Sequence, residues 1–452
     1  MGFNLQSDTV KDLQAAGVLL VEDGNHGENR PRPDEFAEQG VSFIRAADMD
    51  GGRILFGSAS RINDRALRRI RKGIGQPGDI ILSHKGTVGK LAAAPLDCEP
   101  FVCSPQTTFW RVLQEDQLDR RFLYFFMNSI EFKNQLSAVK GETDMADYVS
   151  LTAQRRLQIP RLPLAVQQEI GRVLGSLDDK IELNLRMNET LEAMAQAIFR
   201  DWFVDFGPSR RKLDGETDPV TIMGGLVQDV ERAQAYANLF PATIADDGLP
   251  DGWEEKQVGD VVALIKRGLA PSYSEDGILV INQKCIRNKA VNLAAARRHD
   301  VVKRPPRDRL LEEYDVVVNS TGVGTLGRVA TVRGLKEEAT ADSHVTICRA
   351  DTSKVSKLIL SLFMEGQEAL IETMGHGSTG QTELSPASLS AMTLAVASKP
   401  VQLAFDNFVM PLRNLVISNS EQSLTLAETR DLLLPKLMSG EIRLGEAVEA
   451  AA

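Results

Sequence analysis

GTVGKLA at residues 86–92 recurs as GTLGRVA at residues 324–330, 238 residues further along the chain. Four more stretches recur in the same order, at offsets of 235 to 237 residues. They are GDIILS (78–83) with YDVVVN (314–319), VSFI (41–44) with ILVI (278–281), Val166-Gln167 with Val401-Gln402, and Asn184 with Asn419. Because five stretches keep a nearly constant spacing, the sequence predicts a chain built from two similar halves.

Each half shows the same order of secondary-structure signals. Short β-branched runs, such as residues 80–82 and 316–318, are separated by Gly-rich turns and predict strands. A helix over 121–138 or 355–374 follows, and then a long helical run. The predicted fold class is α+β, with two duplicated mixed α/β domains and two long helices.

The segment boundaries follow from this pattern. Gly-containing turns between the halves mark a linker, which contains a short helix over 227–239. We expect a first mixed domain over 1–163, a long helix over 164–206, the linker over 207–248, a second mixed domain over 249–400, a second long helix over 401–442 and a flexible tail over 443–452.

Both long runs carry the alternating 4-3 spacing of a coiled-coil seam. A buried polar residue in a seam costs stability but fixes the register of the two helices. Asn184, Asn188 and Asn419 occupy seam positions and are therefore predicted register residues. The apolar rows of the first run include Ile170, Leu177, Leu191 and Ile198 in one position and Leu174, Ile181, Ala195 and Trp202 in the other.

Two interpretations of these helices stay open. Each could be an ordinary amphipathic helix that packs on its own domain. The length and regularity of the heptads favour pairing of the two helices as an antiparallel coiled coil with pseudo-two-fold symmetry. At about 1.5 Å per residue, such a pair would be a spacer that holds the two domains roughly 55–60 Å apart.

Composition bounds the class of protein. With 43% hydrophobic and 25% charged residues, the chain resembles ordinary globular proteins. No apolar run approaches the roughly 20 residues of a bilayer crossing, and we expect a cytoplasmic chain without a membrane partner. Its four cysteines show no metal-ligand spacing, which favours a reducing compartment. The net charge of -10 argues against coating nucleic acid through bulk charge.

Motifs for catalysis are weak. Residues 322–327 match GxGxxG, but the β-patterned residues 328–333 follow where a dinucleotide site needs a helix, so a hairpin turn is favoured. Pro250-Asp251 and Glu254-Glu255-Lys256 resemble a nuclease motif, but their gap is too short to span two strands. The sequence has no P-loop, HExxH or GxSxG, and it predicts no enzyme, no catalytic residue and no metal site.

Positive charge gathers at matched places in the two halves. Residues 61–72 and residues 297–309 each carry six Lys or Arg. A charge run usually marks a solvated face, but recurrence favours a surface that contacts phosphate, with the neighbouring turns adding donors. The predicted contacts are Arg61, Arg65, Arg68, Arg69, Lys85, Thr87 and Lys90 in the first half, and Arg297, Arg298, Lys303, Ser320, Thr321, Thr325 and Arg328 in the second.

Motifs along nearly the whole chain carry a family resemblance. They are QQEI (167–170), LDDKIELN (177–184), IFRDWF (198–203), LPDGW (249–253) and LLLPKLMSGEI (432–442), with DGNHG (23–27) and GVSFI (40–44) near the start. These stretches resemble the specificity subunits of type I restriction-modification systems, the HsdS family. VQLAF (401–405) matches the family motif less completely than VQQEI (166–170) does. This difference concerns how the second helix docks.

The resemblance implies two target recognition domains, 1–163 and 249–400, which each read one half of a split double-stranded DNA site. The long helices would set the unread gap, and the differing halves imply an asymmetric site. Two adenine-methylating modification subunits and the motor/nuclease restriction subunits would dock on the chain, which would direct both methylation and cleavage. S-adenosylmethionine, ATP and Mg would belong to those partners, with no cofactor in this subunit.

Two rival functions stay open. One is a nucleotide-dependent enzyme that uses the 322–327 turn. The other is a protein-binding scaffold without a DNA role, for which the acidic balance is the main argument.

Overall fold

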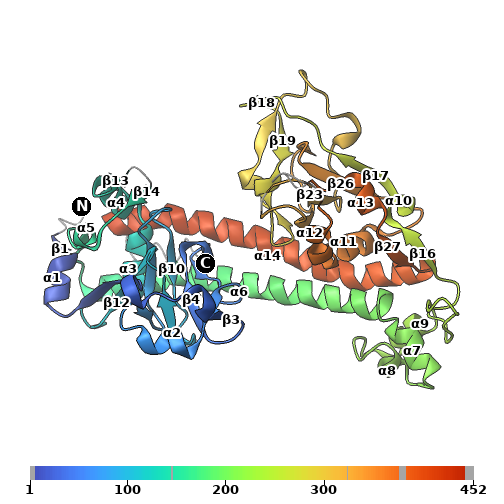
Figure 1. Ribbon diagram of the computed structural model, residues 1–452, viewed down its shortest axis with the longest axis horizontal. Coiled ribbons are helices and arrows are strands. Elements are labelled where there is room, and N and C mark those ends of the chain that lie inside the picture. The colour runs from blue at the N-terminus through green and yellow to red at the C-terminus, as the bar shows by residue number, and fades with distance from the viewer. Residues whose placement is uncertain (1–5, 144–145, 323, 376–382, 443–452) are drawn as a thin grey trace. The chain divides into compact units, whose positions relative to one another are not determined.

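The computed structural model describes residues 6–143, 146–322, 324–375 and 383–442. The tail expected over 443–452 lies outside the described residues. The chain divides into two compact units, each with its own layers of helices and sheets (Figure 1). Unit 1 comprises residues 1–183 and 422–452, and unit 2 comprises residues 184–421.

A four-stranded antiparallel sheet forms the centre of unit 1, in the order β10-β9-β12-β2. Alternate side chains of a strand point to opposite faces. Ile80 and Leu82 of β9 therefore join the core that contains the helices, whereas Ile81 packs with Phe101 of a second sheet. The strands are β2 (Leu19–Asp23), β9 (Ile80–Ser83), β10 (Leu91–Ala93) and β12 (Thr107–Val112).

The second sheet of unit 1 has five strands in the order β3-β7-β4-β11-β8, with β11 parallel to β4 and the other neighbours antiparallel. Its strands are β3 (Phe36–Ala37), β4 (Val41–Ile44), β7 (Ser60–Ile62), β8 (Ile74–Gly75) and β11 (Phe101–Cys103). Three strand pairs complete the unit: β1 (Ser7–Thr9) with β15 (Gln158–Pro160), β5 (Met49–Asp50) with β6 (Arg53–Ile54), and β13 (Gly141–Thr143) with β14 (Ala146–Tyr148).

The helix expected over 121–138 is wrong, because two helices occupy this stretch. Ser129 has an extended backbone, and its hydroxyl accepts a hydrogen bond from the backbone N–H of Phe132 at 3.2 Å. Serine favours such a cap over a helix interior, so it starts a new helix. The helices of unit 1 are α1 (Val10–Ala15), α2 (Asp64–Arg69), α3 (Arg120–Asn128), α4 (Ile130–Ala138) and α5 (Leu151–Gln154), with 3₁₀ turns η1 (Gly27–Asn29), η2 (Pro33–Glu35) and η3 (Ala46–Asp48).

Unit 2 repeats this topology, which confirms the predicted duplication. Its central antiparallel sheet has the order β17-β26-β23-β24, and its second sheet has the order β18-β22-β19-β25 with β19 parallel to β25. These strands are β17 (Val262–Arg267), β23 (Val316–Asn319), β24 (Val329–Thr331) and β26 (Val345–Ala350), then β18 (Tyr273–Ser274), β19 (Ile278–Ile281), β22 (Arg297–His299) and β25 (Ala339–Ala341). Two pairs complete the unit: β16 (Glu254–Gln257) with β27 (Thr393–Val396), and β20 (Ile286–Arg287) with β21 (Ala290–Val291).

The hairpin interpretation of the 322–327 turn is confirmed, because β23 and β24 are antiparallel neighbours on either side of it. The helix expected over 355–374 is again two helices, which meet at Gln367. The helices of unit 2 outside the linker are α10 (Val258–Val261), α11 (Lys357–Gly366), α12 (Glu368–Thr373) and α13 (Pro386–Ser390), with 3₁₀ turns η4 (Gln283–Cys285), η5 (Leu293–Ala295) and η6 (Arg307–Arg309).

The linker over 207–248 contains more structure than the single helix expected over 227–239. That helix is α9 (Val230–Ala237), and α7 (Gly207–Leu213) and α8 (Pro219–Ile222) precede it. Arg211 of α7 binds both carboxylate oxygens of Asp201 at 2.8–2.9 Å, and Phe240 lies edge-on to Trp202 with ring centroids 5.0 Å apart. These contacts hold the linker against the apolar core of unit 2.

The two long helices are α6 (Leu164–Phe203) and α14 (Lys399–Ser439). In unit 2, Asn188, Glu192 and Phe199 of α6 contact Val416, Arg413 and Phe405 of α14 in turn, so the helices run antiparallel. In unit 1, Asp178 pairs with Arg430 at 2.7 Å. The predicted antiparallel pairing is confirmed (Figure 1), and both helices contribute residues to the core of each unit.

Candidate nucleic-acid interface

Polar side chains gather at one rim of the central sheet in unit 1, around the turn between β9 and β10. Lys85, Gly86 and Thr87 at the tip of this turn are exposed, and the backbone of Lys85 forms an isolated bridge with that of Tyr148. Gly89 has a φ of 94°, a conformation that favours glycine and closes the turn tightly. We name Asp23, His84, Lys85, Thr87 and Tyr148 rim 1.

His84 lies below this tip, with 3% of its surface exposed. Its Nδ1 atom is 3.0 Å from the carbonyl oxygen of Val149, so Nδ1 carries a proton and donates it to that oxygen. Among the described residues, His84 Nε2 and Asp23 Oδ1 are buried without a hydrogen-bond partner, 3.7 Å apart. Burial and the Asp23 carboxylate raise the pKa of Tyr148, which keeps the phenol a donor at neutral pH.

The turn between β23 and β24 carries a corresponding rim in unit 2. The Arg267 guanidinium binds Glu383 Oε1 at 2.7 Å and the carbonyl oxygens of Leu384 and Ser343 at 2.8 and 3.1 Å. Thr321 Oγ1 lies 2.8 Å from His344 Nδ1. We name Arg267, Ser320, Thr321, His344 and Glu383 rim 2.

Strand register makes the two rims equivalent position by position. Asp23 lies opposite Thr108, and Arg267 lies opposite Thr346 at the same place in the matching strand pair. The backbone N–H of His84 donates to Gln106, and that of Ser320 donates to His344. Lys85 bridges to Tyr148 as Thr321 bridges to Glu383. The scaffold is therefore shared, but a carboxylate in one rim is replaced by a guanidinium in the other, and a phenol by a carboxylate.

Comparison with known proteins gives this scaffold a family. Residues 24–193 match the model of the type I restriction modification DNA specificity domain. The chain is 27% identical to the specificity subunit of the type I restriction enzyme HindI from Haemophilus influenzae, over 89% of this chain and 94% of that one. It is 22% identical to the MjaIX specificity subunit from Methanocaldococcus jannaschii, over 85% of this chain and 82% of that one. Over most of its length, the chain is therefore similar to the specificity subunits of type I restriction-modification systems.

The fold of a solved relative agrees with this family. The crystal structure of a type I restriction-modification S subunit from M. genitalium covers 96% of each chain with a TM-score of 0.50. The two sequences are 13% identical, so this likeness concerns the fold alone.

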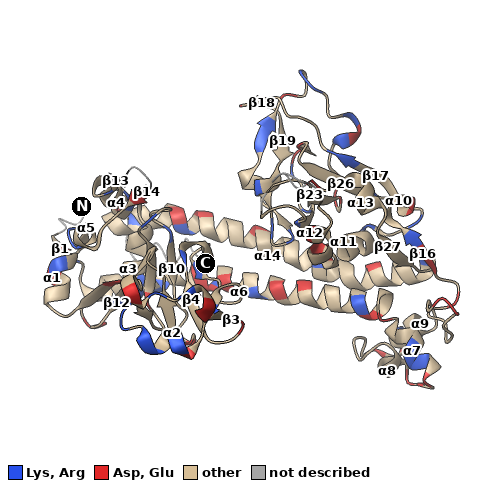
Figure 2. Cartoon of the chain, in the orientation of Figure 1, with Lys and Arg blue, Asp and Glu red and all other residues tan. Residues whose placement is uncertain are grey.

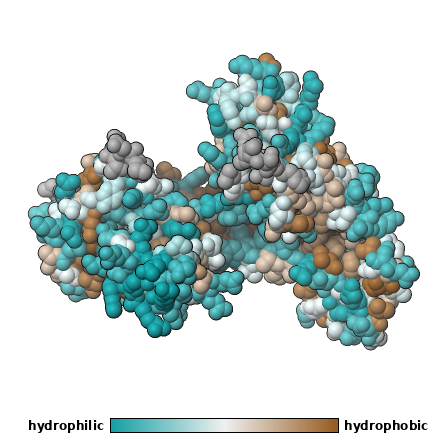
Figure 3. Space-filling view, in the orientation of Figure 1, coloured by the Kyte–Doolittle hydropathy of each residue, from teal (hydrophilic) through white to brown (hydrophobic). Residues whose placement is uncertain are grey.

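Three of the six cations in the first basic segment, Arg61, Arg65 and Arg69, are engaged within unit 1. Arg69 binds both carboxylate oxygens of the fully buried Glu35, and Arg65 lies 3.6 Å from Asp34. The Arg69 guanidinium and the backbone N–H of Arg32 lower the pKa of Glu35 to about 2. Arg61 donates to the carbonyl oxygen of Gly40. Arg68 is exposed without an ion-pair partner among the described residues, on the charged and hydrophilic surface over α2 (Figures 2 and 3).

The second basic segment is engaged in a similar way. Arg298 binds Glu337 at 2.7 Å and the carbonyl oxygen of Gly277, as its register equivalent Arg61 binds Gly40. Arg297 stacks on the ring of Tyr273, and Lys303 lies 3.5 Å from Asp300. The recurrence of these arginines thus follows from contacts that hold each second sheet together. Their role in DNA binding stays a prediction.

The predicted side chains near the hairpin turns divide into three groups. Lys90 turns inward to the carbonyl oxygens of Ala46 and Met49, and Ser320 is buried against Thr346. Lys85, Thr87 and Thr321 lie at the rims, while Arg328 and Thr325 bond within their own turn, to the carbonyl oxygens of Gly324 and Thr321. The rims are therefore brought together by the fold, but most of each basic segment is not part of them.

The three predicted register residues meet in unit 2. Asn188 donates to the carbonyl oxygen of Val416 at 3.3 Å, and Asn184 donates to the carbonyl oxygen of Asn419 at 3.3 Å. The side-chain amide of Asn419 donates to Oδ1 of Asn188, which joins two of the predicted residues directly. That they set the register stays a prediction.

Most of the rim residues that differ between the halves carry no local signal in the sequence. Asp23, Tyr148, Arg267 and Glu383 lie far from the turns in sequence and reach them only through strand pairing. The duplication could have identified these residues, because strand ends that align between the two halves lie at the same rim.

Proposed function

We propose that this chain reads a split, asymmetric double-stranded DNA site and gives a type I restriction-modification complex its sequence specificity. Rim 1 reads one half of the site and rim 2 reads the other. The chain itself carries out no catalysis.

One observation carries this proposal: register-equivalent positions of two copies of one scaffold hold different polar side chains. Asp23 and Arg267 differ in charge, and so do Tyr148 and Glu383. Base edges in the major groove present distinct patterns of donors and acceptors, so different side chains at the same place select different bases. A shared scaffold with differing rims therefore predicts two unlike half-sites.

The buried polar atoms of rim 1 support direct contact with bases. Leaving a buried donor or acceptor unpaired costs about 1–3 kcal/mol. Asp23 Oδ1 is such an acceptor, and an amino group of cytosine or adenine would satisfy it. Lys85 at the tip supplies a donor for guanine or for phosphate.

The partners in this proposal supply the chemistry. Two adenine-methylating modification subunits and the motor/nuclease restriction subunits assemble on the chain, and they hold S-adenosylmethionine, ATP and Mg. The paired helices α6 and α14 set the number of unread base pairs between the half-sites. We place the complex in the cytoplasm, where its four free cysteines stay reduced. Among the described residues, no helix is long and apolar enough to cross a membrane.

Co-expression with the modification subunit of the same operon tests the proposal. The purified complex is expected to bind genomic duplex fragments that contain its site in preference to random duplexes of equal length, and to methylate adenines there. A chain that never co-purifies with a methyltransferase and binds all duplexes equally would contradict it. Gly324→Ala tests the rival hypothesis of a nucleotide-dependent enzyme. That hypothesis predicts that the variant loses nucleotide binding and keeps normal DNA recognition.

A further inference from the structure

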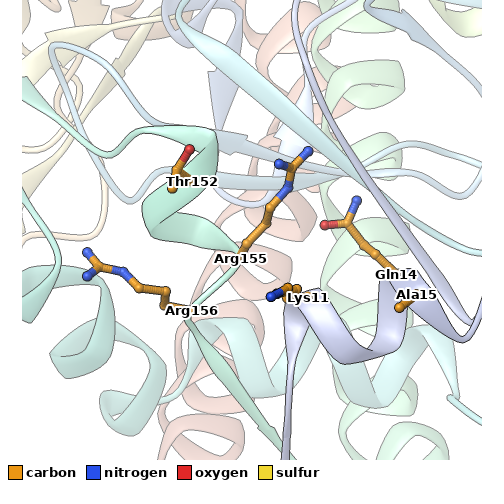
Figure 4. A pocket seen from close by; sticks show the side chains of 6 residues that line it. All are labelled: Lys11, Gln14, Ala15, Thr152, Arg155 and Arg156. Carbon is orange, nitrogen blue, oxygen red and sulfur yellow. The ribbon is translucent and has the colours of Figure 1, made fainter.

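A basic hollow lies in unit 1 between α1 and α5, apart from both predicted basic segments. Its volume is about 560 Å³, and it is lined by Lys11, Gln14 and Ala15 of α1, by Thr152 of α5, and by Arg155 and Arg156 just after α5. Figure 4 shows the Arg155 side chain between Thr152 and Gln14. Three of the six lining residues are cations, and none is acidic.

The backbone places these cations together. Lys11 N–H donates to the carbonyl oxygen of Arg155 at 3.0 Å, and Val10 N–H donates to that of Leu157 at 2.9 Å. The side chains of Lys11, Arg155 and Arg156 are exposed and form no ion pair among the described residues. Of the nearby carboxylates, Asp8 binds Arg161, whereas Asp12 accepts from the Thr9 hydroxyl and forms no ion pair with these cations. The hollow therefore carries three cations that form no ion pair among the described residues.

The same corner of unit 2 shows that the fold does not need these charges. Thr9 pairs with Gln158 in unit 1 as Gln257 pairs with Thr393 in unit 2. Counting from these pairs, Gly259, Ser390 and Ala391 stand where unit 1 has Lys11, Arg155 and Arg156. A Cβ atom on Gly259 would lie 2.0 Å from Ser390 Oγ, so small residues close this corner. The cations are thus a feature of one half only.

The hollow lies close to rim 1, because Gln154 at the end of α5 accepts a hydrogen bond from Thr108, which lies opposite Asp23. Tyr148, which bridges to Lys85, is followed after two residues by α5, and the hydroxyl of Ser150 caps this helix. Four helical residues span about 6 Å, whereas one strand of a duplex presents a phosphate about every 3.4 Å of its axis. A duplex that lies on rim 1 therefore carries backbone phosphates past Arg155 and Arg156.

We propose that the α1–α5 hollow binds backbone phosphates of duplex DNA that flanks the half-site read by unit 1. This inference rests on the proposed function. The lining offers cations, a hydroxyl and an amide but no aromatic anchor, which suits phosphate oxygens better than a protein partner. Because unit 2 lacks these cations, the complex binds the DNA backbone more strongly on one flank of the site than on the other.

The test uses the full chain in complex with its modification subunit and duplexes that carry the site mapped from methylated adenines. In K11Q/R155Q/R156Q, the negative slope of log K against log salt is expected to become less steep by about 2–3. Binding is expected to weaken on the order of 10-fold. The preference for the site over random DNA should be unchanged. The matched control K11R/R155K/R156K keeps the charge and should keep the wild-type slope.

Neutral methylphosphonates in the DNA locate the contact. Placed in the flank beyond the unit 1 half-site, they should weaken the wild-type complex but leave the K11Q/R155Q/R156Q complex unaffected. Placed in the opposite flank, they should weaken both equally. A wild-type salt slope in the variant, or equal effects of both flanks, would overturn the inference.

Two other outcomes would also overturn it. If the variant keeps DNA binding but no longer assembles with the modification subunit, the hollow binds an acidic protein surface. If inorganic phosphate or ATP binds the wild-type complex and not the variant, with the DNA salt slope unchanged, the hollow binds a free phosphate compound. Failure of the proposed function is distinct, because the wild-type complex itself would then show no preference for any site.

Discussion

The side-chain amide of Asn419 in α14 donates a hydrogen bond of 2.9 Å to the Oδ1 atom of Asn188 in α6. Asn188 in turn donates to Ser420 Oγ and to the carbonyl oxygen of Val416. A network of this kind between two antiparallel helices is satisfied in one alignment and broken by a slip of one residue. In unit 2, we therefore expect this network of polar seam residues to favour a single register of the helix pair.

The first prediction concerns this bond. N419L alone leaves the Asn188 amide short of a partner and should lower the free energy of unfolding by about 1 kcal/mol. The double variant N188L/N419L should recover that loss, since apolar pairs in such seams are often as stable as polar ones. Urea unfolding of the four chains in a double-mutant cycle measures the coupling, and strictly additive effects would contradict it.

The second prediction concerns the most buried ion pair. Arg413 of α14 and Glu365 of α11 each have 1% of their side chain exposed and lie 2.8 Å apart, and Arg413 also binds Glu192 of α6. R413M leaves the Glu365 carboxylate buried without its cation and should cost about 3–5 kcal/mol. The double variant R413M/E365Q should lose markedly less. Denaturant unfolding compares the two, and equal losses would contradict the prediction.

The third prediction is a pH dependence of stability. The pKa of Glu35 is lowered from 4.5 to about 2, first by hydrogen bonds from Arg69 and from the backbone of Arg32. Its stabilising effect is therefore present above pH 4.5 and is lost as the pH falls toward 2. E35Q should be less stable than the wild type at neutral pH, and the difference should shrink through that window. A difference independent of pH in urea unfolding would contradict this account.

The fourth prediction separates the two rims. K85Q in unit 1 should change the tolerated bases in one half-site only, and T321V in unit 2 should change those in the other half only. Loss of a base contact costs about 1–3 kcal/mol of discrimination, whereas loss of a phosphate contact weakens all duplexes alike. Competition binding with duplexes varied in one half-site at a time measures this. A change spread over both half-sites by either variant would contradict the assignment.

How much the sequence predicted depended on whether the signal was local. The repeat and the heptads gave the duplicated α+β architecture and the antiparallel helix pair, because both are patterns along the chain. The hairpin at 322–327 followed from glycines and a β-patterned continuation. Ser129 and Gln367 interrupt two predicted helices, since a capping hydroxyl or a turn outweighs a continuous apolar pattern.

The candidate site was harder to predict, because it depends on contacts distant in sequence. The basic segments looked like one DNA surface, yet Arg69 is held by Glu35 and Arg298 by Glu337, from segments 34 and 39 residues away. Asp23 and Tyr148 reach the Lys85 turn only through strand pairing. The spacing of charges along the chain does not reveal how the strands pair.

Genome-wide mapping of N6-methyladenine in a host that carries this chain with its modification subunit tests the central claim most directly. The account predicts one methylated motif made of two short, different half-sites separated by a fixed number of unread base pairs, absent when this chain is deleted. A continuous motif, two identical half-sites, or methylation that does not depend on this chain would contradict it.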